Sequence, residues 1–370
     1  MDTDNAFSSL TPLHYLSKIF GLSLFDIFGR KKIPLFSTDL ILSVLNLFLI
    51  LAIELITIYK KIKIYPKMKW TLIITDTSIW ISSTTTAVVC TLSAMFQSRK
   101  KITKAAQMLT QVDRLLIAKP KNFYLKIKNT LIAELAIAIS FVTFIVGYHI
   151  YVWSSESINN MYLFGFYLTH IINFITNFQF CNMVQIIWYR FRIINKIISK
   201  MWNIVTDESK GRNWFILKRV NIRILDENNF NCWIDNKRKS RKELNITVYL
   251  YVALSFPTNV KANSCEGENI VHVICSSLFW ALFFVIKMVL ITTACSVATN
   301  ESRKTPFILQ SILLKQELNI DETEQVQMFC EQVMVRKLHL TACGFFDIDM
   351  SLLCSVAEAV TTYLVILVQT

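Results

Sequence analysis

Six segments of this chain are each apolar over about 20 residues or more, and they limit the folds that are open to it. They cover residues 40–59, 70–96, 131–152, 161–188, 270–298 and 351–370. A helix of about 20 apolar residues spans the hydrocarbon core of a bilayer. Mean hydropathy is +0.43, and only 7 glycines and 6 prolines are available to interrupt helices in 370 residues. The sequence therefore predicts an all-α polytopic membrane protein.

A seventh apolar segment, residues 246–260, is shorter than the others and contains Pro257. Its length is below the usual minimum of about 17 residues for a transmembrane helix. We expect it to supply the fifth of seven transmembrane helices. Three explanations of its length stay open: a tilted short helix, a truncated allele and a mis-joined gene model.

The basic residues predict how the seven helices are oriented. Of 39 Lys and Arg residues, 32 lie on the side that holds the N-terminus and 6 on the other, while Lys287 lies within a span. Cytoplasmic loops carry the excess of Lys and Arg in membrane proteins. The sequence therefore predicts a cytoplasmic N-terminus and an extracellular C-terminus, the reverse of a G-protein-coupled receptor. The net charge of +13 then reflects topology, and we expect no nucleic-acid partner.

The last apolar segment has its polar residues along one side. At about 100° per residue, the side chains that fall on or beside this stripe are Ser351, Ser355, Glu358, Thr362, Val365 and Gln369. The opposite side is aliphatic. Two interpretations stay open: the stripe lines a water-filled pore, or it packs against neighbouring helices through hydrogen bonds. In a fourfold assembly, four copies of Glu358 would form an acidic ring, which favours cations.

The same segment resembles the end of insect gustatory receptors, a family related to insect odorant receptors. Thr362, Tyr363 and Gln369 match the T-Y-five-apolar-Q-F signature that closes these proteins, while Thr370 stands where the family has Phe. Residues 343–349, C-G-F-F-D-I-D, are similar to the run that precedes this signature. Residues 295–305 are similar to the family's C-x-x-x-x-N-E-x-x-x-T segment.

The resemblance implies a tastant-gated, non-selective cation channel that passes monovalent and divalent cations. Such a channel is a homo- or hetero-tetramer in the plasma membrane, which for this family implies a sensory neuron. The implied organisation is a cytoplasmic N-terminal segment (1–38), transmembrane helices 1–6 with the ligand pocket (39–298), a cytoplasmic anchor helix (299–342) and a pore-lining helix (343–370).

Helix direction indicates which residues a ligand can reach from outside. These lie at the start of the second, fourth and sixth spans and at the end of the first, third and fifth. The polar and aromatic residues that we select there as candidate pocket residues are Asp76, Trp80, His149, Tyr151, Tyr167 and His170. Rings with a few polar groups suit a small amphipathic tastant or a stacked sugar. The alternatives are an interfacial aromatic belt for the rings and ordinary packing for the histidines.

Other function classes fit the sequence less well. A secondary solute transporter would show an internal repeat or glycine-broken helices, and a non-conducting gustatory-receptor-like product with an impaired fifth helix is a further alternative. An enzyme is not expected, because the five histidines are dispersed and no GxSxG, HExxH or GxGxxG motif occurs. No CxxC pair or metal-ligand spacing is present, so we expect no metal and no cofactor. We also expect no N-terminal signal peptide.

Overall fold

The computed structural model describes residues 9–22, 38–64, 70–96, 108–113, 120–153, 160–205, 267–315, 320–341 and 346–369. The named helices within these ranges are α1 (Thr11–Ile19), α2 (Thr38–Ile64), α3 (Trp70–Phe96), α5 (Pro120–Trp153), α6 (Asn160–Val205), α10 (Gly267–Lys315), α11 (Ile320–Val335) and α12 (Met350–Gln369). The described residues contain no β-strand, only an isolated bridge between Thr341 and Asp347. The predicted all-α class is confirmed. The predicted fifth span, 246–260, lies outside the described residues.

Three stretches of the described residues are long and apolar enough to cross a membrane: Leu40–Tyr59, Asn122–Val152 and Ile274–Leu314. The first coincides with the predicted span 40–59, the second contains the predicted span 131–152, and the third contains most of the predicted span 270–298. The predicted span 70–96 has the same limits as α3, and 161–188 lies within α6. Because glycine and proline are scarce, these helices are long. Pro120 is the first residue of α5, a position whose N–H would have no partner within the helix, so proline costs no hydrogen bond there.

Two helices are much longer than a bilayer is thick. α6 has 46 residues and α10 has 49, which at 1.5 Å per residue gives about 70 Å each, against about 30 Å of hydrocarbon. Both are therefore long enough to continue well outside the membrane. α10 is helical on both sides of residue 298, so the predicted boundary there is not a break in the helix. That it marks a membrane edge stays a prediction.

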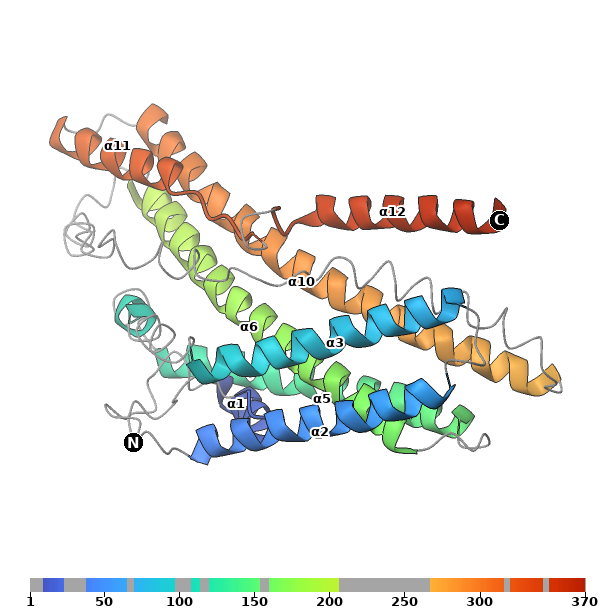
Figure 1. Cartoon of the computed structure of the whole chain (residues 1–370). Helices are drawn as coiled ribbons and strands as arrows, with labels where there is room; N and C mark the ends of the chain where they lie inside the picture. The colour runs from blue at the N-terminus through green and yellow to red at the C-terminus, as the bar shows by residue number, and fades with distance from the viewer. Residues whose placement is uncertain are drawn as a thin grey trace.

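α6 runs through the middle of the bundle and packs against α2, α3 and α10 (Figure 1). Separate clusters of buried side chains lie along it: Tyr167 with Ile145 and Trp280, then Ile172 with Ile50 and Ala87, then Val184 with Cys295 and Leu338. Within a bilayer such contacts stabilise through van der Waals packing, since lipid tails are as apolar as the side chains.

α1 is short but tightly fixed to the bundle. Its last turn closes with a Schellman motif, in which the Leu22 N–H donates to Ser17 O at 2.8 Å and the Gly21 N–H to Lys18 O at 3.0 Å. Gly21 has φ +66, and a Cβ there would lie 2.8 Å from the Ser43 Cα. Glycine is therefore needed both for the left-handed backbone and for the close approach to α2.

α12 lies at the edge of the molecule and contacts α10 (Figure 1). Its first turn is capped by Asp349, whose Oδ1 accepts hydrogen bonds from the Ser351 hydroxyl at 2.5 Å and from the Ser351 N–H at 3.0 Å. The bond from the Ser351 hydroxyl is the main cause that lowers the pKa of Asp349 below its ordinary value. The aspartate therefore fixes where the last helix begins.

Candidate functional site

Aromatic and histidine side chains from three helices meet near one end of the bundle. α5 ends there, while α6 and α10 begin there (Figure 1). We define the aromatic cluster as His149 of α5, Phe166, Tyr167 and His170 of α6, and Trp280, Phe283 and Phe284 of α10. On the predicted topology, this end of the bundle faces outside.

The Trp280 indole is at the centre of the aromatic cluster. Its ring centroid lies 5.1 Å from that of Phe166, 5.4 Å from His170 and 5.8 Å from His149. The Tyr167 ring is stacked on it at 6.2 Å with an interplanar angle of 9°. Offset and edge-to-face pairs at these distances are favourable. Trp280 therefore ties α10 to both α5 and α6.

Polar groups border the cluster on the side of α3. His149 Nδ1 and the Tyr167 hydroxyl are 2.5 Å apart. Ser83 of α3 lies 3.5 Å from His170 Nδ1, and the Asn173 amide donates to Ser83 O at 3.1 Å. The histidines therefore contact both rings and hydrogen-bonding groups, as a site for an amphipathic ligand would require.

Three buried polar atoms near the cluster have no hydrogen-bond partner among the described residues. They are Trp280 Nε1, Ser276 Oγ and Asn173 Oδ1. Their residues are 8%, 2% and 7% exposed. Most buried polar groups in proteins are paired, so three unpaired atoms in one region mark a place where a ligand could supply the partner.

A second pair of side chains forms the rim between this cluster and the end of the bundle. The Tyr148 hydroxyl of α5 lies 3.1 Å from His272 Nδ1 of α10. The Tyr151 ring also contacts His272, at 6.2 Å. Tyr148 and His272 therefore link the end of α5 to the start of α10.

The structure brings three of the six predicted pocket residues together: His149, Tyr167 and His170. Tyr151 lies at the rim and is 67% exposed, and Trp80 is half-buried in α3, one turn before Thr84. Asp76 is in α3, but its side chain is not among those that the structure describes. The assignment of all six to a ligand pocket stays a prediction.

Sequence reasoning missed the contribution of α10. Ser276, Trp280, Phe283 and Lys287 follow one another at spacings of three or four residues, which places them on one helix face, and Phe284 lies beside Phe283, four residues after Trp280. This spacing is visible in the sequence. Leu278, Phe279 and Leu282, which lie between these residues, are also apolar, so hydropathy does not distinguish the inward face of α10.

The predicted pore residues lie on α12. Glu358 and Thr362 are exposed, and the Thr362 hydroxyl donates to Glu358 O at 2.9 Å within the helix. Tyr363, Val365 and Gln369 are in α12 as well, but their side chains lie outside the described residues. Pore lining by these residues stays a prediction.

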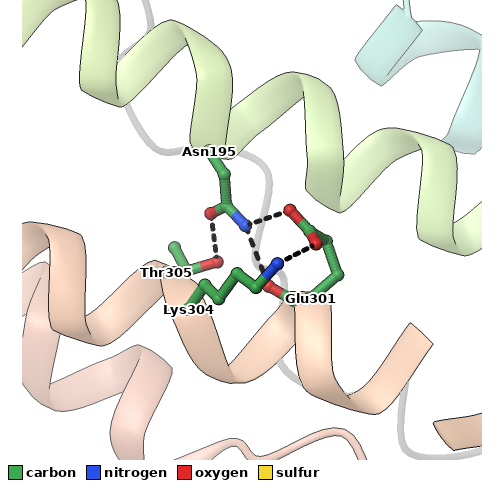
Figure 2. A network of polar contacts seen from close by, with 4 residues as sticks. All are labelled: Asn195, Glu301, Lys304 and Thr305. Carbon is green, nitrogen blue, oxygen red and sulfur yellow. Dashed lines mark hydrogen bonds and ion pairs between the residues drawn. The ribbon is translucent and has the colours of Figure 1, made fainter. Parts of the chain in front are cut away.

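The motif at residues 295–305 forms part of the junction between α6 and α10. Figure 2 shows Asn195 of α6 bonded to Glu301 and Thr305. Its amide donates to Glu301 O at 2.8 Å and to Glu301 Oε1 at 3.1 Å, and its Oδ1 accepts from the Thr305 hydroxyl at 2.7 Å. Cys295 is fully buried at the same junction. Asn195 is the partner that the sequence alone did not indicate.

A buried ion pair lies beyond this cluster, where α5 and α6 meet residues 108–113. Arg190 donates to Asp113 Oδ2 at 2.5 Å, and the Tyr124 hydroxyl donates to the same oxygen at 2.5 Å. The side chains of Arg190 and Asp113 are 6% and 0% exposed. Such a pair fixes how the elements sit, because neither charge can be left alone in a low-dielectric interior.

No group of three or more His, Cys, Asp or Glu side chains within the described residues is arranged to hold a metal ion. The cysteines that the structure describes are free thiols, with Cys295 and Cys330 buried and Cys354 exposed. The geometry therefore offers two candidate sites, the aromatic cluster and the polar stripe of α12.

The chain matches one family model over nearly its whole length. The family is described as 7tm Chemosensory receptor, and the match covers residues 10–227 and 242–370.

Similar proteins from Drosophila melanogaster are gustatory receptors. The gustatory receptor for sugar taste 43a is 34% identical over 95 residues, which are 25% of this chain and 21% of that protein. Gustatory receptor 68a is 35% identical over 118 residues, 31% of this chain and 29% of that protein. Gustatory and pheromone receptor 32a is 33% identical over 90 residues, 24% and 19% of the two chains. Each alignment thus spans less than a third of the relative.

The fold is similar to the solved structure of the insect olfactory receptor OR5 from Machilis hrabei in complex with eugenol. The TM-score is 0.64, and the likeness covers 98% of both chains at 12% identity. The fold is therefore shared over nearly the full length of both chains, at low sequence identity.

Proposed function

Because this chain belongs to the 7tm chemosensory receptor family and has the fold of an insect olfactory receptor, we propose that it is a subunit of a tastant-gated, non-selective cation channel. Four copies, identical or mixed with sister subunits, surround one pore that α12 lines. A small organic tastant binds at the aromatic cluster. The channel lies in the plasma membrane of a sensory neuron, with its N-terminus in the cytoplasm and its C-terminus outside.

The observation that carries this proposal is the exposure of polar side chains on α12. Glu358 and Thr362 are exposed on the single chain, although the helix has the length and composition of a transmembrane segment. Ionised side chains at the centre of a bilayer cost about 2.5–3.5 kcal/mol. A shared water-filled pore removes that cost, and four Glu358 carboxylates around it attract monovalent and divalent cations.

Exposed apolar side chains on the inner parts of α10 and α11 support contacts between subunits. Phe307, Leu314, Ile320 and Val335 are 68%, 85%, 82% and 83% exposed. They follow residue 298, the predicted end of the sixth span, so on the proposed topology they lie in the cytoplasm and not in lipid. A group of large apolar side chains exposed to water is typical of a protein interface. Their burial against neighbouring subunits suits an anchor that holds the tetramer together.

The names of the similar proteins favour a small organic ligand. Their names refer to sugar taste and to gustatory and pheromone reception, and the OR5 structure is a complex with eugenol. The aromatic cluster offers stacking surfaces with a few polar groups, which suits ligands of this size.

The topology is tested with an epitope tag placed after Thr370. We expect intact insect cells that express the tagged protein to stain before permeabilisation. Staining only after permeabilisation, with a second label showing the protein at the surface, would contradict an extracellular C-terminus and with it the proposed pore helix.

The pore is tested by whole-cell recording with a tastant panel. Glu358→Gln is expected to shift the reversal potential in asymmetric salt, because the acidic ring is neutralised while side-chain volume is kept. Thr362→Val is expected to change conductance, whereas Thr361→Val serves as its control. Thr361 is also exposed on α12, but lies about 100° around the helix from Thr362. Unchanged reversal potentials and conductances in every variant would refute the pore assignment.

A further inference from the structure

Two buried polar atoms on one face of α10, at or beside the aromatic cluster, lack hydrogen-bond partners. Trp280 Nε1 and Ser276 Oγ have no hydrogen-bond partner among the described residues, and their residues are 8% and 2% exposed. Residues four apart on a helix have Cβ atoms about 5–6 Å from each other. The two side chains therefore project from the same face of α10, one turn apart.

The chemistry of the two groups is complementary. The indole N–H only donates, whereas the serine hydroxyl both donates and accepts. An unpaired donor costs most in a bilayer, where no water is available to replace the missing partner. A bound hydroxyl would accept from Trp280 and donate to Ser276.

The surroundings of these atoms are mostly aromatic and contain no acidic side chain of the aromatic cluster. The rings nearest to Trp280 are those of Phe166, His170, Phe283 and His149, and none of the residues of the aromatic cluster is acidic. Lys287 lies two turns further along α10, with Nζ 5.1 Å from the ring centroid of Phe283 and 5.3 Å from that of Phe284. A cationic ligand would therefore find no counter-charge in the cluster and would meet a lysine near it.

We propose that Trp280 and Ser276 together recognise the hydroxyl group of a small uncharged ring compound, whose apolar body packs among the rings of the aromatic cluster. The proposal rests on the proposed function and names the ligand class for that receptor. One hydroxyl matches the two unpaired atoms, whereas a polyhydroxylated sugar would bring further hydroxyls into contact with phenylalanine rings.

The test compares two compounds of the same shape, 2-phenylethanol and propylbenzene, in which a methyl group replaces the hydroxyl. On the wild-type protein, 2-phenylethanol is expected to act at a roughly three- to tenfold lower concentration than propylbenzene, the worth of about one neutral hydrogen bond. Trp280→Phe keeps an aromatic ring and removes the N–H. Ser276→Ala removes the hydroxyl at nearly constant volume. Each variant is expected to shrink this ratio towards one.

The ratio separates recognition from damage to the fold, because a misfolded site weakens both compounds alike. Trp188→Phe is the matched control. It loses the same indole N–H about 30 Å along α6 from Tyr167, at 1.5 Å per residue, and should keep the wild-type ratio. An unchanged ratio in both Trp280→Phe and Ser276→Ala would overturn the proposal.

Binding to the purified protein in nanodiscs, measured by saturation-transfer NMR with the same two compounds, separates this inference from the channel function. One outcome is that the protein binds 2-phenylethanol more tightly than propylbenzene, that this preference depends on Trp280, and that no current is evoked. This outcome would refute the channel and support the site. Currents evoked by a hexose, together with no binding of 2-phenylethanol, would support the channel and overturn the ligand class. A wild-type protein that binds both compounds equally would also overturn it.

Discussion

A methyl group added at Gly165 should weaken the packing of α6 on α2. A Cβ at this position would lie 2.5 Å from Ile53 Cγ2 and 3.5 Å from the Thr57 hydroxyl oxygen. Carbon atoms pack best at about 3.5–4.0 Å, so Gly165→Ala requires a displacement of about 1 Å. The Cγ2 of a β-branched residue in a helix cannot rotate away easily, so the helices themselves must separate.

The magnitude follows from a matched substitution elsewhere in the chain. Gly147→Ala makes the same chemical change in α5, where the added Cβ would have nothing within 4 Å. Both substitutions gain about 1 kcal/mol of helix propensity, and this gain cancels in the comparison. The difference between them is therefore the overpacking cost, about 1–3 kcal/mol.

Thermal unfolding of the detergent-solubilised protein, followed by fluorescence-detected size exclusion, measures the effect. Gly165→Ala is expected to unfold at a lower temperature than the wild type, and Gly147→Ala at the same or a higher one. Ile53→Ala removes the clashing methyl group. The double variant Gly165→Ala with Ile53→Ala should therefore lose less stability than the sum of the losses in the two single variants. Equal unfolding temperatures for the two alanine variants would refute the reasoning.

Other contacts lead to smaller, separate predictions. Arg190→Gln leaves Asp113 buried without its charge partner, which costs about 3–5 kcal/mol, so labelling of the protein at the cell surface should be abolished. Lys304→Ala is the control: it breaks the Lys304–Glu301 pair, which is worth at most about 1 kcal/mol, and should leave surface labelling intact. Asn195→Ala removes the partner of the Thr305 hydroxyl and one of the two side chains bonded to Glu301, which keeps Lys304. It should lower the unfolding temperature by the equivalent of about 1–3 kcal/mol, and an unchanged temperature would contradict the network in Figure 2. Asp349 has a lowered pKa, so its capping contribution is complete above the ordinary carboxyl pKa of 3.8 and is lost as pH falls through the lowered value. Unfolding measured against pH should therefore show an acid-side loss in the wild type that Asp349→Asn lacks, and parallel profiles would count against the cap.

Local signals in the sequence were sufficient to predict where the helices lie. The predicted span 70–96 has the limits of α3, and 40–59 lies within α2, because hydropathy and the scarcity of glycine and proline act on each segment separately. The segment from Cys295 to Thr305 was singled out by its resemblance to a family motif. Its side chains do lie at the junction of α6 and α10, although its partner Asn195 is about 100 residues away in the chain.

The candidate site was predicted only in part. Helix direction placed His149, Tyr167 and His170 at one end of the bundle, and these three residues do meet in the aromatic cluster. It could not select Trp280, since Leu278 and Leu282 beside it are equally apolar and yet 50% and 46% exposed.

The sequence by itself determined the class, the helices and the polar stripe of the last span, since each depends on residues close together in the chain. The tertiary structure decided which face of each apolar helix points inward, which glycine allows α6 to approach α2, and which buried polar atoms stay unpaired. The physical reason is that helices such as α10 carry apolar residues on their exposed sides as well as on their buried side, so hydropathy carries little information about the inward face. That face is chosen by shape and by hydrogen bonds with residues on other helices.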